Sequence, residues 1–219
     1  MTTSLGDALS DVRRAYRLLA DYQQRLFELL GYMRERLGAT AYFQDYVFGR
    51  PGNVSGLEND EFAGWRYLPC FDLSVIWLKH GNQEAPWDTH RAGDQMFGAW
   101  IRSDTGFDKY SGRFVDEPID EARSELVLSV VMCDTPAPAP CNWYNRVWCG
   151  IPYPPDGTVG HSDAVPGYRC YAKAIALEAL ADQVAVDRAI DDWCDAASEA
   201  LGVPVGSTRK GHAVGVPIA

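Results

Sequence analysis

The sequence lacks the long hydrophobic runs that insertion into a membrane requires. No stretch approaches the 18 or more uncharged apolar residues of a membrane span. Residues 1–11 also lack the basic region and the apolar run that mark a secretory signal peptide. These two absences predict a cytoplasmic protein that does not bind membranes.

Basic residues are scarce as well. The chain has 20 Lys and Arg residues against 30 Asp and Glu residues, which gives a formal net charge of -10. A molecule with this charge repels phosphate backbones, so direct binding of nucleic acid by bulk charge is excluded. Apolar residues make up 47% of the 219 residues, which is enough for a well-buried core. We therefore expect a single domain over residues 1–204.

Dense catalytic and cofactor-binding motifs are also missing. The chain has no GxxxxGK[ST] loop, no GxGxxG at a strand-to-helix turn and no HExxH. Cys133, Cys141 and Cys149 recur every eight residues, whereas zinc sites pair ligands two to four residues apart. We therefore predict no metal and no cofactor, and the balance is against an enzyme.

The strongest pattern that is present lies in the first 37 residues. Apolar residues recur there in alternating steps of three and four, interrupted only by Gln23. Ser4 is placed to cap the start of a helix, and Gly38 is placed to end it in the left-handed conformation. The pattern predicts a helix over 5–37. At 1.5 Å per residue this helix is about 50 Å long, so it must cross the whole body, bend or project from it.

The apolar stripe of this helix allows two interpretations. Positions beside the stripe hold alanine, tyrosine, phenylalanine and leucine rather than the charges that flank a two-stranded coiled coil. Such a wide stripe favours packing of the helix on a sheet or in a bundle. A helical dimer interface is the alternative, so the chain is either a monomer or a homodimer.

Residues 40–177 have the texture of β-structure. Short aromatic and β-branched runs alternate there with clusters of Gly, Pro, Asn and Asp. The predicted strands are 42–48, 71–78, 96–102, 125–133, 143–149 and 168–177. Their connections are too short for crossover helices, which favours antiparallel pairing.

The remaining segments complete the expected fold. Residues 151–167 hold four prolines and three glycines and are expected to form a long loop. Helical spacing of apolar residues predicts a second helix over 181–201, and residues 205–219 are expected to be a mobile tail. The predicted fold class is α+β: a long N-terminal helix and an acidic C-terminal helix packed on a mostly antiparallel sheet of five to seven strands.

The second helix has the most distinctive charge pattern. Asp187, Asp191 and Asp195 repeat every four residues on one face, where like charges repel one another. A cationic partner would relieve this repulsion. Trp87 lies in a polar loop, and an exposed tryptophan of this kind is a candidate anchor for a protein partner. The leading hypothesis is therefore a protein-binding or regulatory module that recognises a basic protein, with the aspartates imitating the phosphates of a nucleic acid.

Two other classes of function stay open. A metal-assisted hydrolase or transferase would have its site near the 151–167 loop, because catalytic groups converge in space rather than in sequence. Its candidate residues are His161, Asp163, Asp116 and Asp120. The third class is a structural subunit that assembles through the N-terminal helix.

Overall fold

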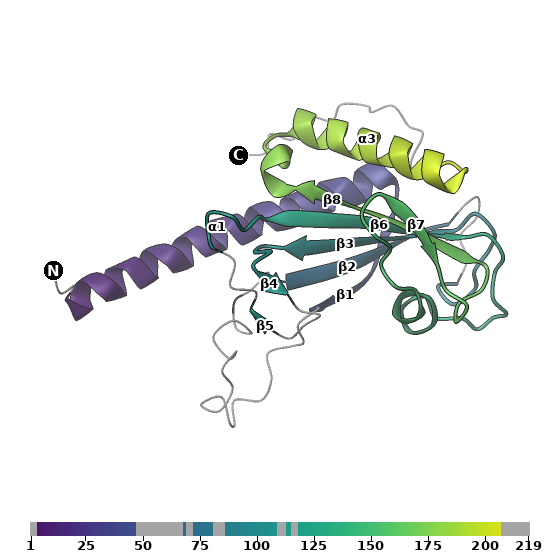
Figure 1. Cartoon of the computed structure of the whole chain (residues 1–219), viewed down its shortest axis with the longest axis horizontal. Helices are drawn as coiled ribbons and strands as arrows, with labels where there is room; N and C mark the ends of the chain where they lie inside the picture. The colour runs from purple at the N-terminus through teal and green to yellow at the C-terminus, as the bar shows by residue number, and fades with distance from the viewer. Residues whose placement is uncertain are drawn as a thin grey trace, which may run out of the picture.

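The computed structural model shows two long helices and a six-stranded antiparallel sheet (Figure 1). The structure describes residues 4–46, 68, 72–80, 86–108, 113–114 and 118–206. The predicted α+β fold class is confirmed.

The sheet has the order β1-β2-β3-β6-β8-β7, and every neighbouring pair is antiparallel. Its strands are β1 (Thr40–Tyr46), β2 (Asp72–Lys79), β3 (Gln95–Arg102), β6 (Glu125–Cys133), β8 (Tyr168–Ala176) and β7 (Thr158–His161). Strands β4 (Phe107–Asp108) and β5 (Arg113–Phe114) form a separate small ladder that the sequence analysis did not predict.

Both helices lie on one face of the sheet. Helix α3 (Gln183–Leu201) crosses this face, and the C-terminal half of α1 (Leu5–Leu37) runs beside it (Figure 1). Trp193 of α3 is buried against Phe97 and Tyr171, with ring centroids 6.3 and 6.0 Å apart, and its indole donates to the carbonyl oxygen of Leu128 at 3.2 Å. Apolar burial on this face therefore fixes both helices to the sheet.

The ends of the helices follow the signals in the sequence. The Ser4 hydroxyl accepts from the backbone N–H of Asp7 at 3.2 Å, and Gly38 ends α1 with a φ of 66°. Asp182 caps α3 in the same way, by accepting from Ala185 N at 2.8 Å, and Gly202 ends it. Neither helix of the described residues has a stretch apolar enough to span a membrane.

The predicted strand over 143–149 is wrong. Asn142 caps a short π-helix, η2 (Trp143–Val147), by accepting from Asn145 N at 2.8 Å, and the 3₁₀ turn η3 (Trp148–Gly150) follows. Trp143 and Val147 are fully buried on the second face of the sheet. Tertiary packing of these side chains thus overrides the β-propensity of the segment.

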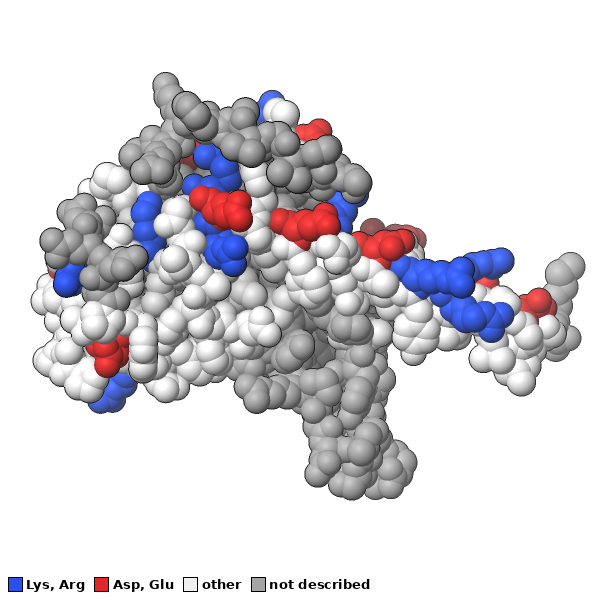
Figure 2. All heavy atoms as spheres, turned by 180° about the vertical axis from the view of Figure 1, so that it is seen from behind, with Lys and Arg blue, Asp and Glu red and all other residues white. Residues whose placement is uncertain are grey.

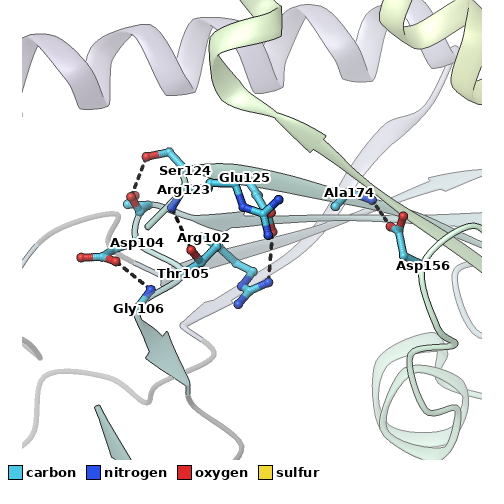
Figure 3. Close-up of polar contacts among 10 residues, drawn as sticks. Arg102, Asp104, Thr105, Gly106, Arg123, Ser124, Glu125, Asp156 and Ala174 are labelled. Atoms are coloured by element: carbon cyan, nitrogen blue, oxygen red, sulfur yellow. Dashed lines mark hydrogen bonds and ion pairs between the residues drawn. The ribbon is translucent and has the colours of Figure 1, made fainter. Parts of the chain in front are cut away.

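The expected loop over 151–167 contains the edge strand β7. Gly157, with a φ of 70°, turns the chain, and the Asp156 carboxylate accepts from the backbone N–H of Ala174 at 2.6 Å (Figure 3). This bond holds the turn against β8, so that Thr158 pairs with Ala172.

The segment after α3 is fixed at its beginning. Val205 is buried, and the side chain of Gln95 donates to the carbonyl oxygen of Pro204 at 2.9 Å and accepts from Gly206 N at 3.1 Å. Residues 207–219 of the expected mobile tail lie outside the described residues.

Candidate functional site

The apolar seam of α1 divides into a buried part and an exposed part. The buried part belongs to the domain core and consists of Leu26, Leu30, Met33 and Leu37. The exposed part continues the same alternating steps of three and four, with exposed fractions of 77% for Leu5, 49% for Leu9, 48% for Val12 and 69% for Tyr16. One seam therefore packs the core at one end of the helix and contacts solvent at the other.

We call residues 5–21 of α1 the arm. The arm extends beyond the sheet and ends at the N-terminus, far from the rest of the fold (Figure 1). None of its residues is buried, and the first buried residue of α1 is Leu26. Helices without tertiary contacts are marginal in water at this length, because most helical stability in proteins comes from packing of an apolar face. The arm therefore has the character of a helix that needs a partner.

Polar contacts fix α1 at the point where the arm leaves the body. The hydroxyl of Tyr22 lies 3.0 Å from that of Ser103, and Arg25 donates to the carbonyl oxygen of Ala181 at 2.6 Å. Ser103 is itself held, since the hydroxyl of Ser124 donates to its carbonyl oxygen at 2.7 Å. These contacts set the direction in which the arm projects.

The end of the sheet that carries Ser103 is tied together by polar contacts (Figure 3). Arg102 and Arg123 lie 3.1 and 3.6 Å from the half-buried carboxylate of Glu125, and Arg123 N donates to the hydroxyl of Thr105 at 2.8 Å. In the next turn, the carboxylate of Asp104 accepts from Gly106 N at 2.8 Å. The base of the arm is thus anchored on a well-bonded sheet end.

A groove of about 670 Å³ opens beside the base of the arm. It lies between α1, the 3₁₀ turn η4 (Leu177–Leu180) and the start of α3. Its apolar lining comes from Tyr22, Leu26, Leu29, Leu177, Leu180, Val184 and Val186. Val184 is 67% exposed, so part of this apolar lining is open to solvent.

The charges of the arm balance. Its acidic residues are Asp7, Asp11 and Asp21, and its basic residues are Arg13, Arg14 and Arg17. Figure 2 shows the basic side chains gathered along the arm, with acidic side chains toward its tip. The arm is therefore neutral within a chain of net charge -10.

The aspartates of α3 have a cation within the chain. Arg36 of α1 donates to Asp187 at 2.7 Å and to Asp191 at 2.9 Å, and the hydroxyl of Tyr32 donates to Asp187 at 2.6 Å. Burial and the hydrogen bond to Asp187 raise the pKa of Tyr32. Arg36 thus relieves the repulsion between Asp187 and Asp191, and these two carboxylates have a cationic partner within the chain. Asp195 lies exposed one turn further along α3.

The other predicted site residues are dispersed. His161 is the exposed last residue of β7, Asp163 is exposed in the following turn, and Asp120 is exposed in the turn before β6. Among the residues that the structure describes, no hydrogen bond or ion pair joins these three side chains, and no group of three or more His, Cys, Asp and Glu residues could hold a metal. Asp116 lies outside the described residues. Trp87 is 54% exposed, as predicted, in a turn.

A buried polar cluster around Tyr168 was not predicted from the sequence. The imidazole Nδ1 of His90 lies 2.7 Å from the Tyr168 hydroxyl, which also accepts from Ala137 N at 3.1 Å. His90 stacks on Trp143 with ring centroids 3.9 Å apart, and burial lowers its pKa. Burial likewise raises the pKa of the neighbouring Cys133 to about 11. The cluster is enclosed, and it holds the segment around Trp143 against the second face of the sheet. His90 could not be recognised as part of a buried cluster from the sequence, because it stands alone in a polar stretch.

The fold and the exposed seam define an α+β protein with a projecting helical arm. The chain belongs to the PM0109 family, which it matches over residues 2–202. It is 31% identical over 205 residues to the Uncharacterized protein PM0109 of Pasteurella multocida (strain Pm70), with 90% of this chain and 96% of that protein covered. No solved structure matches the chain. The family match includes the whole arm.

Proposed function

We propose that this protein is an assembly subunit whose binding element is the arm of α1. The exposed half of the seam carries the proposal, because its apolar side chains repeat at the spacing that buries the other half in the core. Burial of one such side chain contributes about 1.5–3 kcal/mol, so a row of them supports a specific complex.

The partner element is an amphipathic helix. A helix that lies along another helix presents an apolar row at the same steps of three and four, and the groove beside Tyr22 and Val184 extends the surface on which such a helix lies. Because the arm is neutral, the partner helix needs no excess of either charge. We place the assembly in the cytoplasm, because the described cysteines are free thiols, which suits a reducing compartment.

Site-specific photo-crosslinking in living cells tests this function. A photoreactive side chain replaces Val12, which lies on the seam, or Arg14, which lies on the outer face of the same turn. We expect discrete protein adducts from position 12 that are absent from position 14 and that disappear when Leu9→Glu is added. Equal adducts from the two positions, or none from position 12, would contradict the proposal.

A further inference from the structure

We infer that His90 is a pH-sensitive latch for residues 137–150, which we call the cover because they lie over the second face of the sheet. The neutral imidazole holds the cover closed, and protonation of the ring releases it. The inference goes beyond the proposed function and does not depend on it, because the cover lies on the face of the sheet opposite α1 and α3 (Figure 1).

The cover is packed on the sheet and tied to the stretch of chain that carries His90. Trp143 and Val147 of the cover are fully buried in the hydrophobic cluster on this face. The backbone N–H of Cys141 donates to the carbonyl oxygen of Asp88 at 2.8 Å, two residues before His90. Movement of the His90 ring out of the cluster therefore loosens the cover as well.

One hydroxyl group joins the cover, the sheet and His90. Tyr168 of β8 accepts from the backbone N–H of Ala137 at 3.1 Å, and its oxygen lies 2.7 Å from Nδ1 of His90. The hydroxyl has one proton to donate, and Nδ1 accepts it when the neutral ring carries its own proton on Nε2. The ring of His90 also stacks on Trp143 with centroids 3.9 Å apart. The neutral ring therefore contacts both the anchor on the sheet and the centre of the cover.

Protonation changes Nδ1 of His90 from an acceptor to a donor. The hydroxyl of Tyr168 then accepts from both Ala137 and His90, so its own proton must turn to another acceptor. The neighbouring thiols of Cys133 and Cys141 are weak acceptors. The charged ring also loses its hydration in the buried cluster. The closed arrangement therefore loses a hydrogen bond of good geometry and buries a charge when His90 is protonated.

The groups around His90 act in both directions on its charge, and burial is the largest influence. Burial lowers the pKa of His90, and nearby His80 acts in the same direction. The backbone of Cys141 and the carboxylates of Asp94 and Asp88 oppose this change, as does the stack on the indole. The other titratable and charged groups of the surrounding elements are Tyr168 on β8, Cys133 and Asp134 at the end of β6, Cys141 and Arg146 on the cover, and Arg91 beside the ring in the chain.

The sign of the pH effect follows from these two environments. A ring that is exposed by opening of the cover has its ordinary pKa of 6.5, whereas the closed ring has a lower pKa. The open cover therefore binds the proton more tightly than the closed cover. Closure is fully favoured above pH 6.5, and this contribution is lost as the pH falls toward the pKa of the closed form.

Amide hydrogen exchange of the full chain at about pH 7.5 and about pH 5.5 tests the latch, after correction for the intrinsic exchange rate at each pH. The opening constant of residues 141–150 should rise by up to about tenfold at the lower pH, because the open ring takes up its proton over this range. Residues 126–132 of β6 should keep theirs. An unchanged opening constant in 141–150 would overturn the latch. An equal rise in 126–132 would overturn it too, because the whole domain would then be unfolding.

Three variants separate His90 from the other histidines. His90→Gln removes the titrating ring, so the rise in 141–150 should disappear. It should persist in His161→Gln, whose side chain is exposed, and in His80→Gln. His80 is the matched control, because its Nδ1 lies 3.4 Å from the buried carboxylate of Asp94, and a positive charge on it would favour the closed arrangement. A rise that persists in His90→Gln would overturn the inference.

NMR of the ¹⁵N-labelled wild type gives a test that needs no variant. At neutral pH the His90 ring should carry its proton on Nε2, with Nδ1 as an acceptor, and the ring should titrate below pH 6.5. A proton on Nδ1 at neutral pH, or a titration at or above pH 6.5, would overturn the latch. Neither result changes the photo-crosslinking expected from position 12, so failure of the latch and failure of the proposed function are distinguishable.

Discussion

The phenolic oxygen of Tyr22 lies 3.0 Å from the hydroxyl of Ser103, where α1 leaves the body. On the C-terminal side of this contact, the seam of α1 is buried in the domain core, and on the N-terminal side it is exposed. The contact therefore separates two uses of one helix. The first half is available for assembly, and the second half holds the fold together.

The two halves of the seam should respond differently to the same substitution. Leu30 is 6% exposed, so Leu30→Ala should lower the free energy of unfolding by about 2–5 kcal/mol through lost burial and a cavity. Leu9 is 49% exposed, so Leu9→Ala should change it by less than about 0.5 kcal/mol in dilute protein. Urea denaturation of the two variants measures both values. Equal losses would show that the arm packs on the body.

Arg36 should be a stabilising residue because it joins the two helices. Arg36→Gln removes its bonds to Asp187 and Asp191 and should cost about 1–3 kcal/mol. The matched control is Arg14→Gln, whose ion pair with Asp11 is exposed at 2.9 Å and should contribute less than about 0.5 kcal/mol. Thermal denaturation compares the variants, and equal effects would contradict the role of Arg36.

Much of the fold could be predicted from local chemistry. The caps Ser4 and Gly38 and the apolar spacing between them define α1, and a run of β-branched and other apolar residues defines strands such as β6. The segment Trp143–Val147 was mistaken for a strand because its aromatic residues have β-propensity, while its helical turn depends on burial against a distant sheet. Local pattern does not encode that contact.

The candidate site shows a different limit of prediction from the sequence. Leu9 and Leu30 have the same chemistry and the same place in the repeat, so the spacing could not distinguish the exposed residue from the buried one. Core packing was the favoured interpretation of the apolar stripe, and the structure confirms it from Leu26 onward. The pairing of Asp187 with Arg36 was also hidden, because 151 residues separate them in the chain.

Stability should fall in mild acid because of His90. Burial is the main cause of its lowered pKa, which nearby Asp94 opposes and His80 reinforces. The unfolded chain titrates His90 near its ordinary pKa of 6.5, so the contribution of neutral His90 is present above that pH and is lost as the pH falls toward the lower folded pKa. His90→Gln should flatten the dependence of the unfolding free energy between about pH 7 and 5, with exposed His161→Gln as the control. An unchanged slope in His90→Gln would contradict this account.

Two glycines should respond to alanine in opposite directions. A Cβ at Gly98 would overlap the indole of Trp148 and lie 2.7 Å from the Ser129 hydroxyl, so Gly98→Ala should cost about 1–3 kcal/mol. A Cβ at Gly31 in α1 meets no atom within 4 Å, so Gly31→Ala should stabilise the protein by about 0.5–1 kcal/mol through helix propensity. Thermal denaturation of the two variants measures the sign of each change in stability. A stabilising Gly98→Ala would show that the Trp148 ring moves away without cost.

Assembly through the seam should stabilise the arm helix, and amide hydrogen exchange tests this stabilisation most directly. Residues 6–20 are compared with residues 27–36 in the wild type and in Leu9→Glu, each isolated under native conditions together with the proteins bound to it. We expect protection of both segments in the wild type, and in Leu9→Glu we expect the arm to lose protection while residues 27–36 keep it. An arm that is equally protected in both proteins, or unprotected in both, would contradict the claim.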